Sequence, residues 1–285
     1  LLLMFLVVAT KTSILLLLWM ASHLTRLDKK LHLLKESSKK ALVAYLVAGD
    51  PDLDSTLELM HGFVNAGVDI LEVGVPFTDP IAEGPIIQAA HDRALKQGTS
   101  LGRIFNLVKE FRVQDNDTPI ILMGYINTFL ANTKALEESH ISGTDAVLIV
   151  DIPGESSLKD LGINDQHLAS ISLIAPTTSA ERITKICNTS SGFIYYVTLR
   201  GVTGSSNLDI QEAEKNIIDI RSQTSLPVLA GFGIKTPTDA LNLSKISDGV
   251  VIGSSLVEMI NEQSHQKEYK KIYNYLNSMS EAINS

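Results

Sequence analysis

The sequence predicts a single-domain α/β protein in which eight parallel strands alternate with helices to form a closed (β/α)8 TIM barrel. Three observations support this prediction. The chain has 285 residues, enough for one barrel of about 250 residues. Short runs rich in Val, Ile and Leu recur along it, as expected for parallel strands that are covered on both faces. No linker or low-complexity segment divides the chain after Met20.

An open doubly wound sheet is the alternative architecture for this alternation of elements. Such a sheet would need a Gly-rich turn after its first strand, and the sequence Ala48-Gly49-Asp50-Pro51 matches such a turn poorly. We therefore favour the closed barrel.

The first twenty residues differ from the rest of the chain. Residues 1–20 are almost wholly apolar, which is compatible with a signal anchor or a marginal membrane helix. However, the sequence begins with Leu1, and no small-residue cleavage site follows a charged segment. We favour the interpretation that Met20 is the natural start, that residues 1–20 are not part of the native fold, and that residues 21–285 form the barrel domain.

The elements are assigned in chain order from their hydrophobic patterns. Leu24, Leu27, Leu31 and Leu34 recur at helical spacing and predict an extra N-terminal amphipathic helix that lies on a larger body. The predicted strands cover residues 41–48, 69–75, 119–125, 146–152, 170–175, 192–198, 227–232 and 249–252. The predicted helices cover residues 54–66, 86–96, 101–112, 127–139, 180–187, 210–222 and 237–243, and residues 256–279 are expected to form one terminal helix or two. Pro85 is well placed at the start of the helix over 86–96. The pattern over 154–169 is less regular.

Glu72 lies in the middle of the second predicted strand, where a charged carboxylate is costly unless it is paired or used. Because strand residues alternate between faces, Ile70, Glu72 and Gly74 are expected to share one face. Glu83 follows in a loop rich in Pro and Gly. Two carboxylates near one strand end predict an acid/base site at the C-terminal mouth of the barrel. The alternative is that Glu72 is a paired core carboxylate.

Other strand and loop residues are candidates for the walls of this site and for an anion site. The wall candidates are Tyr45, Met123, Tyr125, Leu148, Val150, Ile174, Tyr195 and Phe232. Glycines gather after the last three predicted strands, in residues 201–204, 231–233 and 253–255. Because the loops after strands seven and eight of such barrels often bind phosphate, we expect a phosphate site there. Residues 201–209 are also rich enough in Gly and Ser to form a mobile lid.

Composition argues against several other classes of function. The net charge of −8, with no basic cluster, argues against a nucleic-acid partner. The single cysteine, Cys187, excludes a disulfide framework and fits a reducing cytosol, so we expect a cytoplasmic protein without a membrane partner. The seven histidines lack ligand spacing, which predicts no metal site.

Several segments together resemble the tryptophan synthase α subunit family. The segment Leu-Glu-Val-Gly-Val-Pro-Phe-Thr-Asp-Pro-Ile-Ala-Glu-Gly-Pro, residues 71–85, is similar to the signature of that family. Further matches follow the same order at similar spacing: Ala-Gly-Asp-Pro (48–51), Arg-Gly-Val-Thr-Gly (200–204), Gly-Phe-Gly-Ile (231–234) and Gly-Ser (253–254). The resemblance extends from Leu24 to the C-terminus. It implies a retro-aldol cleavage of indole-3-glycerol phosphate to indole and glyceraldehyde 3-phosphate, in tryptophan biosynthesis.

The resemblance also implies roles for individual residues. Glu72 matches the catalytic glutamate, which moves protons between the substrate hydroxyl and indole C3. Glu83 occupies a position that is normally an aspartate, which holds the indole N–H, so the longer side chain puts the rate in doubt. The remaining matches are Tyr195 as the active-site tyrosine, Tyr45 and Phe232 in the indole pocket, Gly204, Gly233, Gly253 and Ser254 in the phosphate cradle, Thr203 in the lid, and Asp79 and Asn127 at the contact with the β subunit.

The same resemblance implies an α2β2 tetramer with a β subunit, in which pyridoxal phosphate belongs to the β subunit and this chain needs neither a cofactor nor a metal. Two other hypotheses remain open. One is a catalytically weak α subunit that acts mainly as an activator of the β subunit, which the aspartate-to-glutamate change at position 83 suggests. The other is a different phosphate-binding barrel, such as an isomerase of aminoaldose phosphates, for which only Asp50 is available at the ends of strands one and five.

Overall fold

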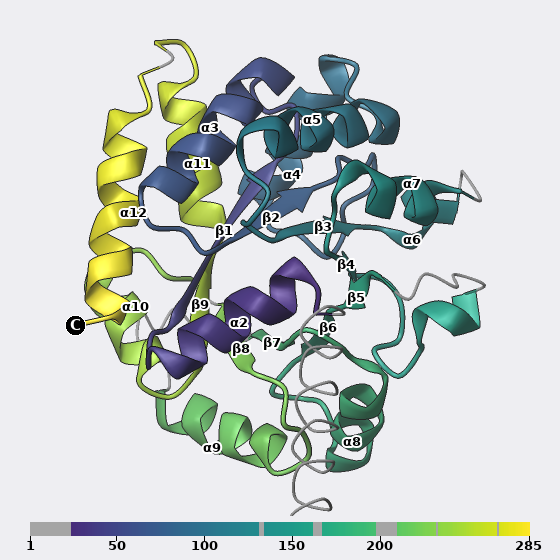
Figure 1. The fold of residues 1–285 in the computed structure, drawn as a ribbon, viewed down its shortest axis with the longest axis vertical. Coiled ribbons are helices and arrows are strands. Elements are labelled where there is room, and N and C mark those ends of the chain that lie inside the picture. Colours follow the sequence, from purple (N-terminus) through teal and green to yellow (C-terminus); the bar gives the residue numbers. More distant parts are fainter. Residues whose placement is uncertain (1–23, 131–133, 162–166, 198–209, 232, 267) are drawn as a thin grey trace, which may run out of the picture.

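The computed structural model describes residues 24–130, 134–161, 167–197, 210–231, 233–266 and 268–285 (Figure 1). The apolar leader at residues 1–20, Thr203, Gly204 and Phe232 lie outside the described residues.

The strands form one parallel sheet in the order β5-β4-β3-β2-β1-β9-β8-β7-β6. They are β1 Ala41–Val47, β2 Ile70–Gly74, β3 Ile120–Gly124, β4 Ala146–Ile149, β5 Ala169–Ser170, β6 Ser172–Ile174, β7 Ile194–Val197, β8 Val228–Gly231 and β9 Gly249–Ile252. The two edge strands, β5 and β6, are separated in the chain by Ile171 alone, so they are two parts of one barrel strand. The first part pairs with β4 and the second with β7, which joins the edges of the sheet. The predicted barrel is confirmed, with its fifth strand divided.

The helices lie around the strands, except for α2, which lies across the centre of the view in Figure 1. They are α2 Arg26–Glu36, α3 Leu53–Asn65, α4 Pro85–Lys96, α5 Leu101–Gln114, α6 Ile126–Leu130, α7 Ala135–Ser142, the 3-10 helix η1 Leu158–Leu161, α8 Ala180–Thr189, α9 Ile210–Arg221, α10 Pro237–Ser244, α11 Ser254–Gln263 and α12 Lys270–Ile283. The single helix expected over 127–139 is replaced by α6 and α7, whereas the terminal segment expected to form one helix or two forms two, α11 and α12. None of the helices in the described ranges is long and apolar enough to span a membrane.

The N-terminal helix α2 closes the barrel interior. Thr25 and Asp28 form a capping box at its start. Leu27, Leu31 and Leu34 are buried in one cluster with interior side chains of the strands, whereas Leu24 is 39% exposed. Three of the four leucines in the predicted pattern therefore form the buried face of this helix.

The side chains of β2 alternate between two apolar layers. Ile70 belongs to the interior cluster that also contains α2, while Leu71, Val73 and Val75 belong to the outer cluster, which packs against the surrounding helices. Because strand side chains alternate, Glu72 points into the barrel, as predicted.

A repeated contact joins the strands in pairs at the amino-terminal rim of the barrel. The residues Asp69, Asp145, Ser191 and Asp248 precede β2, β4, β7 and β9. Each one accepts, through its side-chain oxygen, the backbone N–H of a residue at the start of the preceding barrel strand, at 2.8 to 3.0 Å. The backbone N–H of each of these four residues donates in return to the carbonyl oxygen of the strand residue whose N–H it accepts. We call these four residues the rim caps.

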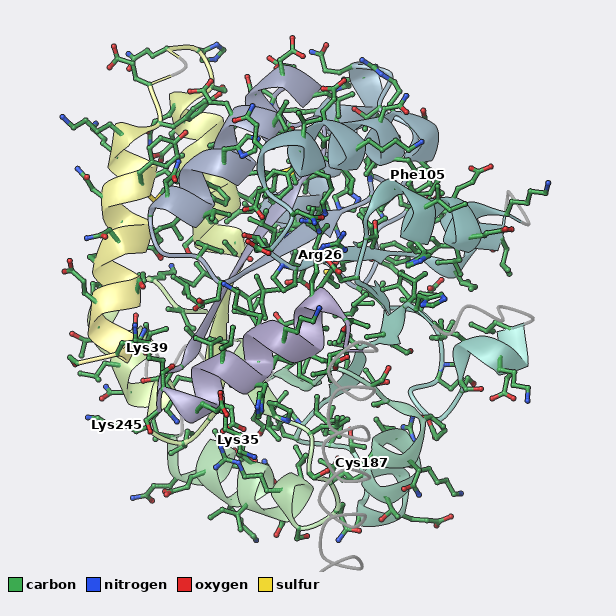
Figure 2. The ribbon with its side chains drawn as sticks, viewed as in Figure 1. Arg26, Lys35, Lys39, Phe105, Cys187 and Lys245 are labelled. Atoms are coloured by element: carbon green, nitrogen blue, oxygen red, sulfur yellow. The ribbon has the colours of Figure 1, made fainter. Side chains whose placement is uncertain are left out.

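The rim cap Asp145 is the most heavily bonded of the four. Arg26, in the first turn of α2 (Figure 2), donates from Nη1 to Asp145 Oδ1 at 2.8 Å. Arg112 of α5 donates from Nη2 to Asp145 Oδ2, also at 2.8 Å. The ion pairs at this rim therefore fix α2 and α5 to the start of β4.

Candidate active site

Glu72 provides a buried carboxyl group inside the barrel. It lies in β2 in register with Tyr45 of β1 and Ile121 of β3, and it is 2% exposed. Its Oε1 atom has no hydrogen-bond partner among the described residues. Burial, with a smaller contribution from the charge of Glu83, raises the pKa of Glu72 to about 8. At neutral pH this group is therefore protonated and able to give up a proton.

Glu83 provides a second carboxyl group, from the loop before α4. It is partly buried, and burial raises its pKa to about 7. Its backbone is held on both sides, because Glu83 N donates to Pro80 O at 3.0 Å and Gln88 Nε2 donates to Glu83 O at 2.9 Å. The helix α4 begins at Pro85, as the sequence predicted.

Two tyrosines from opposite parts of the barrel face these carboxyl groups. A side chain at Gly74 would collide with the Tyr45 hydroxyl, and one at Gly231 would collide with the Tyr195 hydroxyl. The absence of a side chain at these two strand ends therefore leaves room for both rings. Burial and the charges of Glu83 and Glu72 raise the pKa of both tyrosines well above the usual value.

The remaining predicted walls divide into those that face the interior and one that does not. Leu148 is buried in the interior cluster, and Met123 and Val150 pack against it. Tyr125 stacks on Phe77 with ring centroids 4.9 Å apart. Its hydroxyl accepts the backbone N–H of Ala82 at 3.0 Å, which ties this wall to the loop that carries Glu83.

The prediction that Ile174 lines the interior is wrong. Ile174 belongs to the outer cluster and pairs in register with Tyr196, which also lies in that cluster. Its neighbour Leu173 packs against the interior cluster and pairs with Tyr195. Because one step along a strand reverses the face, Leu173 is the wall residue of this strand.

Two of the three segments expected to form an anion site are among the described residues, one after β8 and one at the start of α11. Ser254 is the first residue of α11, and Gly253 precedes it as the N-cap. Gly233 follows β8 with a positive φ of 46°, a conformation that favours glycine. Among the described residues, a Cβ atom built on Gly253 would meet only the Tyr45 side chain, at 3.9 Å. The start of α11 therefore lies beside a wall of the carboxyl site, and a helix N-terminus is a suitable position for an anion.

The predicted partner residues lie on the surface. Asp79, in the loop after β2, and Asn127, in α6, are both exposed. The loop of Asp79 also carries Ile81, which is 85% exposed, and α6 ends at Leu130, which is 48% exposed. These two apolar side chains were not singled out from the sequence. The exposure of Ile81 depends on loop conformation, which hydrophobic patterning does not specify.

Two further side chains belong to this region: Asp50, which the sequence offered only to the isomerase hypothesis, and His91, which was missed. Asp50 is 3% exposed and receives two hydrogen bonds from Arg93 of α4, at 2.7 and 2.8 Å. Asp50 is the only carboxylate that could serve as the acid/base residue of an isomerase, and it is held in this bidentate pair with Arg93. His91 of α4 is 2% exposed and bridges Tyr45 and the backbone of Phe77. Within the described ranges, no group of three or more His, Cys, Asp or Glu side chains could hold a metal ion.

Comparison with known proteins gives the family. The family model described as tryptophan synthase alpha chain matches residues 31–284. The chain belongs to this family. The chain is also 44% identical to the tryptophan synthase alpha chain of Marinobacter nauticus over 269 residues, which cover 92% of this chain and 99% of the relative. Identity to the alpha chain of Alkalilimnicola ehrlichii is 42% over 250 residues, covering 86% and 90% of the two chains.

The solved structures agree with this family membership. The crystal structure of tryptophan synthase subunit alpha from Legionella pneumophila str. Paris superposes with a TM-score of 0.84 at 38% identity, covering 91% of this chain and 98% of that chain. As a tryptophan synthase alpha chain, the protein is a carbon–carbon lyase that cleaves indole-3-glycerol phosphate in tryptophan biosynthesis.

Proposed function

We propose that Glu72 and Glu83 divide the work of this cleavage between a proton carrier and an electrostatic partner. The observation that supports the proposal best is a pair of carboxyl groups near the barrel mouth whose pKa values, about 8 and about 7, differ from those of ordinary carboxyl groups. Near neutral pH, Glu72 is protonated while a substantial part of Glu83 is ionised. One group is then available as an acid while the other carries a negative charge.

The cleavage needs one proton added and one removed. Protonated Glu72 donates to indole C3, which leaves positive charge on the indole nitrogen. The Glu72 carboxylate then takes the proton of the substrate hydroxyl as the C–C bond breaks. The electron pair of that bond returns to the indole ring, and the hydroxyl carbon becomes the aldehyde of glyceraldehyde 3-phosphate. Ionised Glu83 accepts the indole N–H and stabilises the transient cation in a site shielded from water.

The walls and the anion site position the substrate for these steps. Tyr45, Met123, Tyr125, Leu148 and Val150 surround the indole ring, together with Leu173 from the fifth strand. Tyr195 lies beside Glu72, whose charge is the largest charge effect on the pKa of Tyr195. The phosphate is bound by Gly233 after β8 and by Gly253 and Ser254 at the start of α11. The family resemblance adds Gly204 and the lid residue Thr203 to this site.

A β subunit binds the surface that contains Asp79 and Asn127. The family implies such a partner. The exposed Ile81 and Leu130 support this choice of surface, because the buried core of a protein interface is more apolar than its rim. The assembly is an α2β2 tetramer in the cytoplasm, and pyridoxal phosphate belongs to the β subunit, so this chain holds no cofactor of its own.

A second candidate function, activation of the β subunit by a catalytically weak alpha chain, is favoured by one observation. Glu83 replaces the family's usual aspartate, and its side chain is longer by one methylene, about 1.5 Å. If that length misplaces the carboxylate, wild-type turnover will be negligible and the Glu83→Asp variant will restore it.

The experiment is steady-state release of indole from indole-3-glycerol phosphate by the full chain, with and without a β subunit. We expect Glu72→Gln to lower kcat by about 10³-fold, the usual range for loss of a general acid/base. The circular dichroism spectrum and β-subunit binding should be unchanged. Turnover of Glu72→Gln at the wild-type rate would refute the role of Glu72, and the Glu83→Asp variant decides between the two candidate functions.

A further inference from the structure

The buried histidine of α4 has hydrogen-bond partners at both ring nitrogens. His91 Nδ1 accepts the backbone N–H of Phe77 at 3.1 Å, and Nε2 lies 3.4 Å from the Tyr45 hydroxyl. A backbone N–H can only donate, so Nδ1 carries no proton, and the neutral ring must carry its proton on Nε2. Tyr45 Oη therefore accepts a hydrogen bond from His91.

The neutral ring is the form that persists at physiological pH. Burial lowers the pKa of His91 to about 4. Protonation would also place a second proton on Nδ1 and break the bond to Phe77. The direction of both hydrogen bonds is therefore fixed by burial and by the backbone donor.

This arrangement determines what the Tyr45 hydroxyl can do. Its oxygen already accepts from His91, so its own proton is left to be donated. Among the described residues the hydroxyl has no other hydrogen-bond partner. Of the charged groups around Tyr45, Glu83 and Glu72 have the largest effects on its pKa. The structure thus prepares Tyr45 as a hydrogen-bond donor on the side of the two carboxyl groups.

The second bond of His91 acts on the loop that carries Glu83. Phe77 lies at the start of this loop and stacks on Tyr125, with ring centroids 4.9 Å apart. Tyr125 in turn accepts the backbone N–H of Ala82, next to Glu83. The loop is therefore held at its start by His91 and near its end by Tyr125.

We propose that His91 is a positioning residue for the cleavage reaction, which directs the Tyr45 hydroxyl at the two carboxyl groups through Nε2 and fixes the start of the Glu83 loop through Nδ1. The proposal rests on the roles proposed above for Glu72 and Glu83. A purely structural histidine would stabilise the core without changing the kinetics of folded enzyme, and this difference is measurable.

Two amide substitutions separate the two bonds of His91. Asparagine places its oxygen near the position of Nδ1, so His91→Asn keeps an acceptor for Phe77 and loses the donor to Tyr45. Glutamine places its amide nitrogen near the position of Nε2, so His91→Gln keeps the donor to Tyr45 and loses the acceptor for Phe77. Tyr45→Phe removes the hydroxyl itself.

The test is a double-mutant cycle measured as kcat/KM for indole release by the full chain. We expect Tyr45→Phe and His91→Asn each to lower kcat/KM about 10-fold, and the double variant to be no worse than either one, because both remove the same directed donor. Adding His91→Gln to Tyr45→Phe should lower kcat/KM below that of Tyr45→Phe alone, because His91→Gln breaks the hydrogen bond from Phe77 N. His61→Asn, at a half-buried histidine stacked on Phe111, should leave kcat/KM unchanged.

Unfolding midpoints measured for every variant separate stability from kinetics. Additive losses for Tyr45→Phe and His91→Asn would overturn the proposal, as would an unchanged kcat/KM for Tyr45→Phe. The latter result decides the question even if the His91 variants do not fold. Retained turnover in Glu72→Gln is a different result, because it refutes the proposed role of Glu72 and leaves the coupling between Tyr45 and His91 to be judged on its own cycle.

Discussion

Two buried carboxyl groups in this barrel have opposite surroundings. Asp145, at the amino-terminal rim, is 3% exposed and is paired with Arg26, Arg112 and the backbone N–H of Ile120. Glu72, in the interior, is 2% exposed, and its Oε1 has no partner among the described residues. The two groups are equally buried, and they differ in whether hydrogen bonds and cations offset the cost of burial.

The difference separates a carboxylate that holds the fold together from one that the fold keeps reactive. Each pairing partner of Asp145 belongs to another element, so the charge joins α2, α5 and β3 to the start of β4. Glu72 contributes no such connection, and its pKa is raised to about 8 instead. The interior group is therefore expected to reduce stability where it is ionised, whereas the rim group makes buried pairs between elements that are costly to break.

The largest expected effect is on the pH dependence of stability in Glu72→Gln. The pKa of Glu72 is about 8 in the folded chain, against an ordinary glutamate pKa of 4.5. Because the folded pKa is the higher one, the group favours folding fully below pH 4.5, and this contribution is lost as pH rises to 8. The variant, which cannot ionise, should gain on the wild type across this window, by at most about 5 kcal/mol. Urea unfolding at pH 5 and pH 8.5 measures the gain. Parallel pH profiles for the two proteins would contradict the prediction.

The opposite result is expected at the rim. Asp145→Ala should lower the free energy of unfolding by about 3–5 kcal/mol, because it leaves Arg112, whose side chain is 9% exposed, without its buried partner. The kcat of the folded variant should not change. Asp248→Ala is a matched control, since Asp248 is also a rim cap but its ion pair with Arg221 is 39% exposed on both sides. Equal losses in the two variants would show that burial of the pair does not matter.

Much of this fold follows from the sequence because two-layer packing leaves a periodic pattern. The leucines of α2, the alternating faces of β2 and the Pro85 helix start were all predictable. The face of Ile174 was missed although the strand carries a pattern. Ser170, Ile171, Ser172 and Leu173 alternate polar and apolar, which puts Leu173 on the face of Ile171 and Ile174 on the opposite one.

The candidate site was predictable only in part. Glu72 was visible because it is a charged residue within an apolar run, and Glu83 because it follows that strand in a short loop. His91 was not visible, since a histidine in an amphipathic helix has no distinctive pattern and its partner Tyr45 is 46 residues away. The rim caps had a usable signal that was missed: an Asp stands immediately before the apolar run at positions 69, 145 and 248.

The closure of the interior by α2 gives a smaller expected effect. Leu27 is 0% exposed, so Leu27→Ala should cost about 3 kcal/mol, through lost burial and the cavity that remains. Leu33 lies in the same helix but is 60% exposed, so Leu33→Ala should stay within about 0.5 kcal/mol of wild type. Thermal and denaturant unfolding of both variants make the comparison. If both change stability equally, α2 does not contribute to the interior core as its burial indicates.

The smallest effect is expected at the fourth rim cap, where the barrel closes. Ser191 accepts the backbone N–H of Ser170 through Oγ at 2.8 Å, and its own N–H returns to Ser170 O at 2.9 Å. The same two-way contact made by the rim-cap aspartates occurs here with a hydroxyl and without an arginine. Ser191→Ala removes one neutral hydrogen bond near the surface and should cost about 1 kcal/mol in unfolding experiments. Because Ser170 is the last residue of β5, immediately before the division of the fifth strand, a cost as large as that of Asp145→Ala would mean that closure depends on this contact more than on the buried ion pairs.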